Sequence, residues 1–194
     1  MRPCFESCVR KLLSAGARDH GVCDTRECSP LMVASCRGLA GVARLLLDAG
    51  APMDERSPDY GSTALFDAIC HGANDVFALL LNAGADVTAV DIDGRTPIFI
   101  CAFANNHASL LLLLERGASP DVIDNFGSTP LTFSCQDEWE GGDIRLTVEE
   151  LVRVSSTQTL CAVRNSDGRS AIDVLVRRRV RTDGENFDRH AWRP

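Results

Sequence analysis

The sequence predicts an all-α repeat solenoid, in which helix-turn-helix units stack side by side and β-hairpin loops project from them. Three markers recur along the 194 residues with a period of 33 or 34. Self-similarity at such a period is typical of repeat proteins, in which each unit buries its apolar face against its neighbours. The markers are the helix openings Ser29-Pro30-Leu31, Thr63-Ala64-Leu65, Thr96-Pro97-Ile98 and Thr129-Pro130-Leu131; the pairs Gly16-Ala17, Gly50-Ala51, Gly84-Ala85 and Gly117-Ala118; and the glycines Gly61, Gly94 and Gly127.

The unit that begins at Thr96 shows how the local sequence sets each element. The Thr96 hydroxyl is expected to cap the free N–H groups of a short first helix over residues 97–104, and the proline after it fits the first helical turn. Asn105 and Gly117 tolerate a left-handed backbone, so they are predicted to end the first and second helices. An extended stretch and a tight turn over residues 121–127 then lead into the next unit.

These motifs resemble the ankyrin repeat, which has a period near 33 residues and opens with Thr-Pro-Leu-His. The resemblance covers roughly residues 4–180 and implies an ankyrin-type solenoid that binds other proteins. The histidine of the family motif is absent, which implies that a hydrogen bond between neighbouring hairpins is missing. Its place is taken by Met32, Phe66, Phe99 and Thr132.

The ends of the chain and one insertion depart from the repeat. Extra residues fall near 136–146, and Thr147 with Glu150 has the pattern of a capping box that restarts the second helix of that unit. The apolar face of the N-terminal segment is expected to continue into further repeats, or to self-associate. The predicted segments are a partial repeat over 1–28, units over 29–61, 62–94, 95–127 and 128–168, a capping helix over 169–181 and a flexible tail over 182–194.

Composition disfavours several classes of partner. The chain has 20 Lys and Arg against 27 Asp and Glu, a net charge of −7. An acidic surface repels polyanions, so nucleic acid and anionic membranes are disfavoured as partners. The uncharged stretch over residues 96–114 has polar residues at its centre, which argues against a membrane span. Nine cysteines, an odd number, without a recognisable secretory signal favour a cytoplasmic location, with the nucleus as an alternative.

No enzyme activity, cofactor or metal site is expected. The four histidines are scattered, and no nucleophile motif or Gly-rich phosphate loop occurs. A surface of stacked helices also lacks the deep pocket that catalysis usually needs. The cysteines whose spacing comes nearest to a zinc site match no recognised zinc class. They are Cys4, Cys8, Cys23 and Cys28, with His20 nearby.

The predicted binding surface is the concave face formed by the hairpin tips and the first helices. The resemblance places contact positions beside each turn glycine and near the end of each first helix. Aromatic and branched side chains there alternate with acidic ones, which is typical of a protein-binding hot spot and favours a partner with an apolar segment and basic flanks. The candidate residues are Asp59, Tyr60, Ser62, His71, Ile92, Asp93, Arg95, Phe103, Asn125, Phe126, Ser128 and Asp137, with Trp139 from the insertion.

The predicted function is a non-catalytic protein–protein interaction module or adaptor. One alternative is a nuclear regulatory factor that uses the Arg-rich segment 177–181 for nuclear import or nucleic-acid contact. A second alternative, a known use of such repeats, is a substrate receptor of a ubiquitin ligase. That role needs a recruitment motif, and we see none in the short segment after Arg181.

Overall fold

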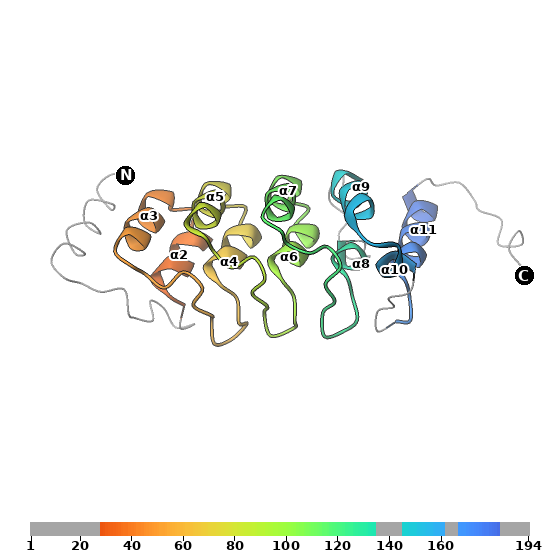
Figure 1. Ribbon diagram of the computed structural model, residues 1–194, viewed down its shortest axis with the longest axis horizontal. Coiled ribbons are helices and arrows are strands. Elements are labelled where there is room, and N and C mark those ends of the chain that lie inside the picture. Colours follow the sequence, from red (N-terminus) through yellow and green to blue (C-terminus); the bar gives the residue numbers. More distant parts are fainter. Residues whose placement is uncertain (1–27, 135–144, 162–166, 183–194) are drawn as a thin grey trace, which may run out of the picture.

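The protein is an elongated array of helix pairs (Figure 1). The computed structural model describes residues 28–134, 145–161 and 167–182, and from residue 177 onward the backbone alone. The described helices are α2 (Pro30–Cys36), α3 (Ala40–Asp48), α4 (Ala64–Cys70), α5 (Asn74–Ala83), α6 (Pro97–Phe103), α7 (His107–Glu115), α8 (Pro130–Ser134), α9 (Arg145–Val154), α10 (Thr157–Cys161) and α11 (Ala171–Thr182).

The helices form two rows, and loops project from one side of the array (Figure 1). The inner row is α2, α4, α6 and α8, in which each helix packs against the next, while α3, α5, α7 and α9 form the outer row. One buried apolar cluster runs from Leu31 to Ala171 and includes Phe77, Phe99 and Leu151. The predicted all-α solenoid is therefore confirmed.

Left-handed residues end the helices at the predicted places. Asn105 has a φ of 50° and is the one non-glycine residue with positive φ in the described ranges. It occupies the position held by Gly38 and Gly72 in the preceding units, where φ is 64° and 63°. Gly84, at the end of α5, has a φ of 94°. Only glycine and asparagine reach this region at low cost, which is why these residues recur at the repeat period.

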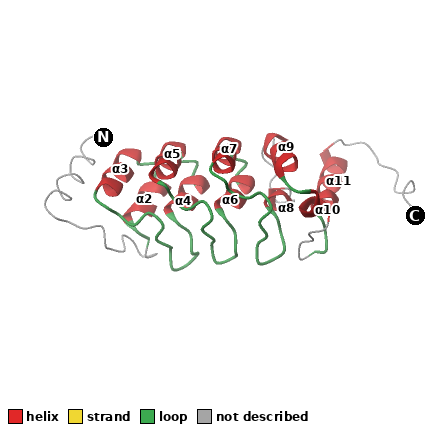
Figure 2. Ribbon diagram, viewed as in Figure 1, coloured by secondary structure: helices red, strands yellow, loops and turns green. Residues whose placement is uncertain are grey.

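The projecting loops are not regular β-hairpins. No strand occurs among the described residues, and the loops connect helices throughout (Figure 2). The expectation of β-hairpins is therefore wrong in its detail: each loop is closed by two short-range backbone hydrogen bonds and not by a strand ladder. The outer bonds are Ser57 N to Ser62 O at 2.8 Å, Asp91 N to Arg95 O at 2.9 Å, and Asp124 N to Ser128 O at 2.9 Å. The inner bonds, from the turn glycines, are Gly61 N to Ser57 O at 2.8 Å, Gly94 N to Asp91 O at 3.1 Å, and Gly127 N to Asp124 O at 3.1 Å.

Neighbouring loops are joined to each other. The Ile92 N–H donates to the Tyr60 carbonyl at 3.0 Å, and the Asn125 N–H donates to the Asp93 carbonyl at 2.9 Å. The Asn125 side chain adds a bond from Nδ2 to the Ile92 carbonyl at 3.1 Å. The loss of the family histidine therefore does not leave the loops unconnected, because backbone and asparagine groups link them.

The threonines that open the helices do not all act as caps. The Thr129 Oγ1 accepts from the Thr132 N–H at 3.2 Å, as expected of a cap. The hydroxyl oxygens of Thr63 and Thr96, in contrast, are buried without a hydrogen-bond partner. The capping predicted for Thr96 is therefore wrong, and Thr63 does not act as a cap either. Three residues after each threonine stands Phe66, Phe99 or Thr132. Of these three side chains, only that of Thr132 is polar, and its hydroxyl bonds to Thr129.

This difference predicts opposite effects of one substitution. Thr96→Val removes a buried hydroxyl that makes no bond, so the free energy of unfolding is expected to stay unchanged or to rise by up to about 1 kcal/mol. Thr129→Val removes a cap and is expected to lower it by about 1 kcal/mol. Guanidinium denaturation followed by circular dichroism measures both. Equal losses in the two variants would contradict the assignment.

The fourth unit departs from the repeat pattern. Helix α9 begins at Arg145, before Thr147, so the predicted capping box is wrong. The Thr147 side chain is buried, and its hydroxyl donates to the Asn105 Oδ1 at 2.7 Å, which ties α9 to the preceding unit. Helix α10 is an addition that the repeat does not predict. Helix α10 begins directly after Ser156. The backbone N–H of Ser156 donates to the Asp121 carboxylate at 3.0 Å.

Candidate protein-binding surface

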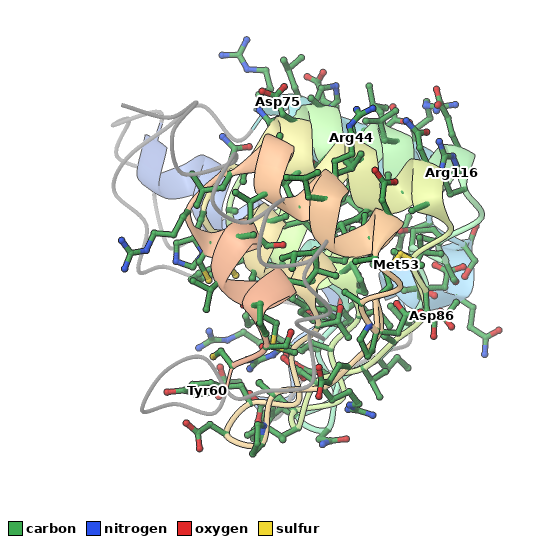
Figure 3. All side chains as sticks on the ribbon, turned by 90° about the vertical axis from the view of Figure 1, so that its left-hand side faces the viewer. Arg44, Met53, Tyr60, Asp75, Asp86 and Arg116 are labelled. Carbon is green, nitrogen blue, oxygen red and sulfur yellow. The ribbon has the colours of Figure 1, made fainter. Side chains whose placement is uncertain are left out.

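Three apolar side chains stand exposed on successive loops. Tyr60 is 65% exposed, Ile92 58% and Phe126 50%. Figure 3 looks along the array and shows Tyr60 at the loop side, opposite Asp75 and Arg44 of the outer helices. The backbone bonds between the loops hold these residues at a fixed spacing. We call Tyr60, Ile92 and Phe126 the apolar stripe.

An aspartate shapes each of the two later loops. The Asp91 Oδ1 accepts the N–H groups of residues 93 and 95, both at 2.9 Å. The Asp124 Oδ1 accepts those of residues 126 and 128, at 2.9 and 2.7 Å. Sequence reasoning missed both aspartates as determinants of the surface. Their signal was available, since each stands three residues before a marker glycine, Gly94 or Gly127.

Two predicted contact residues, Asp93 and Arg95, are bonded to each other. The Arg95 Nη1 lies 2.7 Å from the Asp93 Oδ2. The guanidinium also lies over the rings of Phe126 and Phe133. Phe133 in turn contacts the exposed Phe103, with ring centroids 5.2 Å apart. Phe133 is a further residue that the repeat pattern did not single out.

Other predicted residues occupy different environments. Asp59 and His71 are exposed, and the His71 Nδ1 lies 2.9 Å from the Asp67 carbonyl. Ser62 is bonded to Ser57, with 2.9 Å between the hydroxyl oxygens. Ser128 is 3% exposed, so its side chain is not a surface contact. Predictions that lie outside the described residues are those for Asp137, Trp139, Cys4, Cys8, Cys23 and His20, and the Arg-rich segment has no described side chains.

Two hollows lie along the inner row of helices. The first, about 450 Å³, is bounded by the ends of α2 and α4 and by the Tyr60 loop, with Asp59, Tyr60, Ser62 and His71 in its lining. The second, also about 450 Å³, lies between the ends of α4 and α6 and is lined by Cys70, Phe103 and Asn106 among others. Five of the predicted residues thus line these hollows, and of the apolar stripe Tyr60 lines the first one.

Cys70 at the second hollow is predicted to react slowly with alkylating agents. Burial of the thiol, followed by the Asp67 and Asp91 carboxylates, raises the pKa of Cys70 to about 11. At pH 8 only about 0.1% is then thiolate, and the higher nucleophilicity of a more basic thiolate offsets part of this loss. We expect iodoacetamide to modify Cys70 about 20-fold more slowly than it modifies glutathione.

The raised pKa of Cys70 also predicts how its modification rate changes with pH. Modification of Cys70, read by mass spectrometry, should still rise with pH between 8 and 10, because the thiol stays protonated until the pH approaches its raised pKa. Asp67→Asn removes the larger of the two carboxylate contributions and should speed the reaction at pH 8. A rate that levels off by pH 9 would contradict the raised pKa.

The described residues contain neither a membrane-spanning helix nor a metal-binding cluster. None of the helices there combines the length and the apolar character needed to cross a bilayer. Within the same part of the chain, His, Cys, Asp and Glu side chains form no group of three that could hold a metal ion.

Comparison with known proteins identifies the family. A model of three ankyrin repeats matches residues 3–91, and a model of a single ankyrin repeat matches residues 93–125. Together they cover more than half of the chain, in the register that the marker residues define. The chain belongs to the ankyrin repeat family. Ankyrin repeats are generally protein–protein interaction modules, and proteins of the family are typically non-catalytic.

Relatives of this ankyrin repeat protein include much longer chains. It is 35% identical over 118 residues to the human neurogenic locus notch homolog protein 2 and 32% identical over 124 residues to the mouse neurogenic locus notch homolog protein 1. These matches cover 60% and 63% of this chain, which spans only 5% of the length of either relative. A solved structure, the ankyrin repeat domain of Bcl-3, a unique member of the IkappaB protein family, is similar with a TM-score of 0.73 and 28% identity, over 87% of this chain and 72% of that one.

Proposed function

We propose that this ankyrin repeat protein is a non-catalytic interaction module or adaptor, which binds a partner protein across the loop tips and the inner helices. The observation that supports this most is the apolar stripe, three large side chains that are half exposed or more on three successive loops. Exposed aromatic and branched side chains that cluster at one surface mark interaction sites more often than scattered ones do.

We also expect the stripe to be rigid before any partner binds. Its loops are joined by the bonds from Ile92 N to Tyr60 O and from Asn125 N to Asp93 O. A preformed surface loses little conformational entropy on binding, so a larger share of the contact energy appears as affinity. This rigidity supports a binding role for the loop tips themselves.

The partner's chemistry follows from the groups beside the stripe. Asp59 is exposed next to Tyr60, and the protein as a whole carries a net charge of −7. Of the arginines beside the stripe, Arg95 is paired with Asp93, and Arg56 donates to the Gly61 and Val90 carbonyls. We therefore expect the partner to present an apolar segment with basic flanks, since opposite charges favour encounter and orientation.

A capture experiment tests the proposal. The wild-type protein and the Tyr60→Ala/Phe126→Ala variant are used as baits, and the captured proteins are compared by mass spectrometry. The matched control is Leu111→Ala/Val152→Ala, which removes two apolar side chains that are 36% and 38% exposed on the outer helices α7 and α9. Partners should be lost with the first variant and kept with the second. Identical captured sets from all three baits would overturn the proposal.

A further inference from the structure

Arg95 joins two neighbouring units through an unusual set of contacts. It lies in the loop between α5 and α6, while its guanidinium lies against the ring of Phe126 on the next loop and the ring of Phe133 in α8 of the following unit. The guanidinium carbon is 5.7 Å from the centroid of the Phe126 ring and 4.6 Å from that of Phe133. Both distances fall within the range of cation–π attraction.

Two carboxylates, those of Asp93 and Asp124, lie near the Arg95 guanidinium. Besides the pair with Asp93, the Arg95 Nε lies 3.6 Å from the Asp124 Oδ2, and the Asp124 side chain is 1% exposed. The other oxygen of that carboxylate accepts the N–H of Phe126. Asp124 therefore holds the backbone of Phe126 and faces the arginine that covers its ring.

This arrangement changes the role predicted for Arg95. With 22% of its side chain exposed and its charge balanced, Arg95 is not a free cation for an acidic ligand. Phe126, in contrast, keeps half of its surface exposed although one part of the ring lies near Arg95. The contacts thus leave Phe126 available while they restrict its orientation.

We propose that Arg95 is a positioning residue, which fixes the orientation of the Phe126 ring and so completes the apolar stripe as a preformed binding surface. The inference rests on the proposed function, because it assigns Phe126 to the surface that a partner contacts. It requires arginine and not merely a positive charge. The planar guanidinium can stack on a ring and pair with carboxylates at the same time, which the compact ammonium of lysine does less well.

The first test needs no partner. In the full chain with isotope-labelled phenylalanine and arginine, the wild type should show nuclear Overhauser contacts from the Arg95 side chain to the Phe126 and Phe133 rings. In Arg95→Lys, the Phe126 ring should lose its contact to residue 95 and become more mobile. The backbone amides of Phe126 and Ser128 should keep their protection from hydrogen exchange, since Asp124 Oδ1 still accepts from them.

The matched control is Arg116→Lys. Arg116 also links two units, through bonds to the Leu81 carbonyl at 2.6 Å and the Asn82 Oδ1 at 2.9 Å, but these lie at the end of the outer helices. This variant should leave the Phe126 ring unchanged. A Phe126 ring equally ordered in Arg95→Lys and in the wild type overturns the proposal. Loss of exchange protection at the Phe126 and Ser128 amides also overturns it, because Arg95 would then act on the loop fold.

A second test separates this inference from the proposed function. The proteins whose capture depends on Tyr60 and Phe126 serve as the probe, and Arg95→Lys should reduce their capture about tenfold while Arg116→Lys leaves it unchanged. If those proteins are captured equally by Arg95→Lys, the positioning role is overturned and the proposed function stands. If capture of no protein depends on Tyr60 and Phe126, the proposed function fails, whatever the order of the Phe126 ring in the first test.

Discussion

Replacing Asp124 by alanine is expected to lower the free energy of unfolding by about 3 kcal/mol, the largest effect we expect from a polar substitution in this protein. The Asp124 Oδ1 accepts two loop N–H groups, at 2.9 and 2.7 Å, and its Oδ2 faces the Arg95 Nε at 3.6 Å. Removing a buried carboxylate leaves these donors without their acceptor and the arginine with less of its counter-charge. Chemical denaturation of the full chain measures the loss.

Asp91 supplies the matched control for this prediction. It accepts the corresponding two N–H groups of the preceding loop, both at 2.9 Å, but that site is only partly buried. Water can replace much of a lost bond at a partly exposed site, so Asp91→Ala should cost only about 1 kcal/mol. Asp124→Asn keeps an acceptor oxygen and should fall between the two alanine variants. Equal losses for Asp124→Ala and Asp91→Ala would contradict the role given to burial and to Arg95.

The repeat itself could be predicted from sequence because its signals are local and recur. Left-handed residues after each helix, such as Asn105, have few alternatives, and their spacing fixes the register of the whole array. The apolar stripe was found in the same way, since Tyr60 and Phe126 stand at one repeat position two units apart. Periodicity therefore predicted the fold class and the exposed loop residues.

Features that depend on contacts between units could not be predicted in this way. Thr63 and Thr96 have the sequence of a cap, but their hydroxyls are buried and make no hydrogen bond. Thr147 has the spacing of a capping box, yet its hydroxyl reaches Asn105 in the preceding unit. Likewise, nothing in the sequence around Arg95 indicates that its guanidinium lies against the rings of Phe126 and Phe133. Each outcome depends on which partner is near in space.

The Gly94→Ala variant is expected to destabilise the protein by about 3 kcal/mol, more than the left-handed backbone alone explains. Gly94 has a φ of +78°, and an added Cβ would lie 2.7 Å from the Asn125 Oδ1 and 3.3 Å from the Asn125 backbone nitrogen. Asn125 belongs to the next loop, where its side chain donates to the Ile92 carbonyl. The methyl group would therefore push apart two loops that hold the apolar stripe.

Gly84→Ala separates backbone strain from this clash. Gly84 has a φ of +94°, but a Cβ there would meet nothing within 4 Å. Its cost should be that of a left-handed alanine alone, about 1 kcal/mol, and denaturation of the two variants gives the difference directly. Equal costs would show that Asn125 moves aside freely, so that the loops are not rigidly joined. A larger cost at Gly94, with altered amide signals at Asn125 and Ile92, would show that the spacing of the stripe is set by direct contact between the loops, because no other described group lies as close to the added methyl.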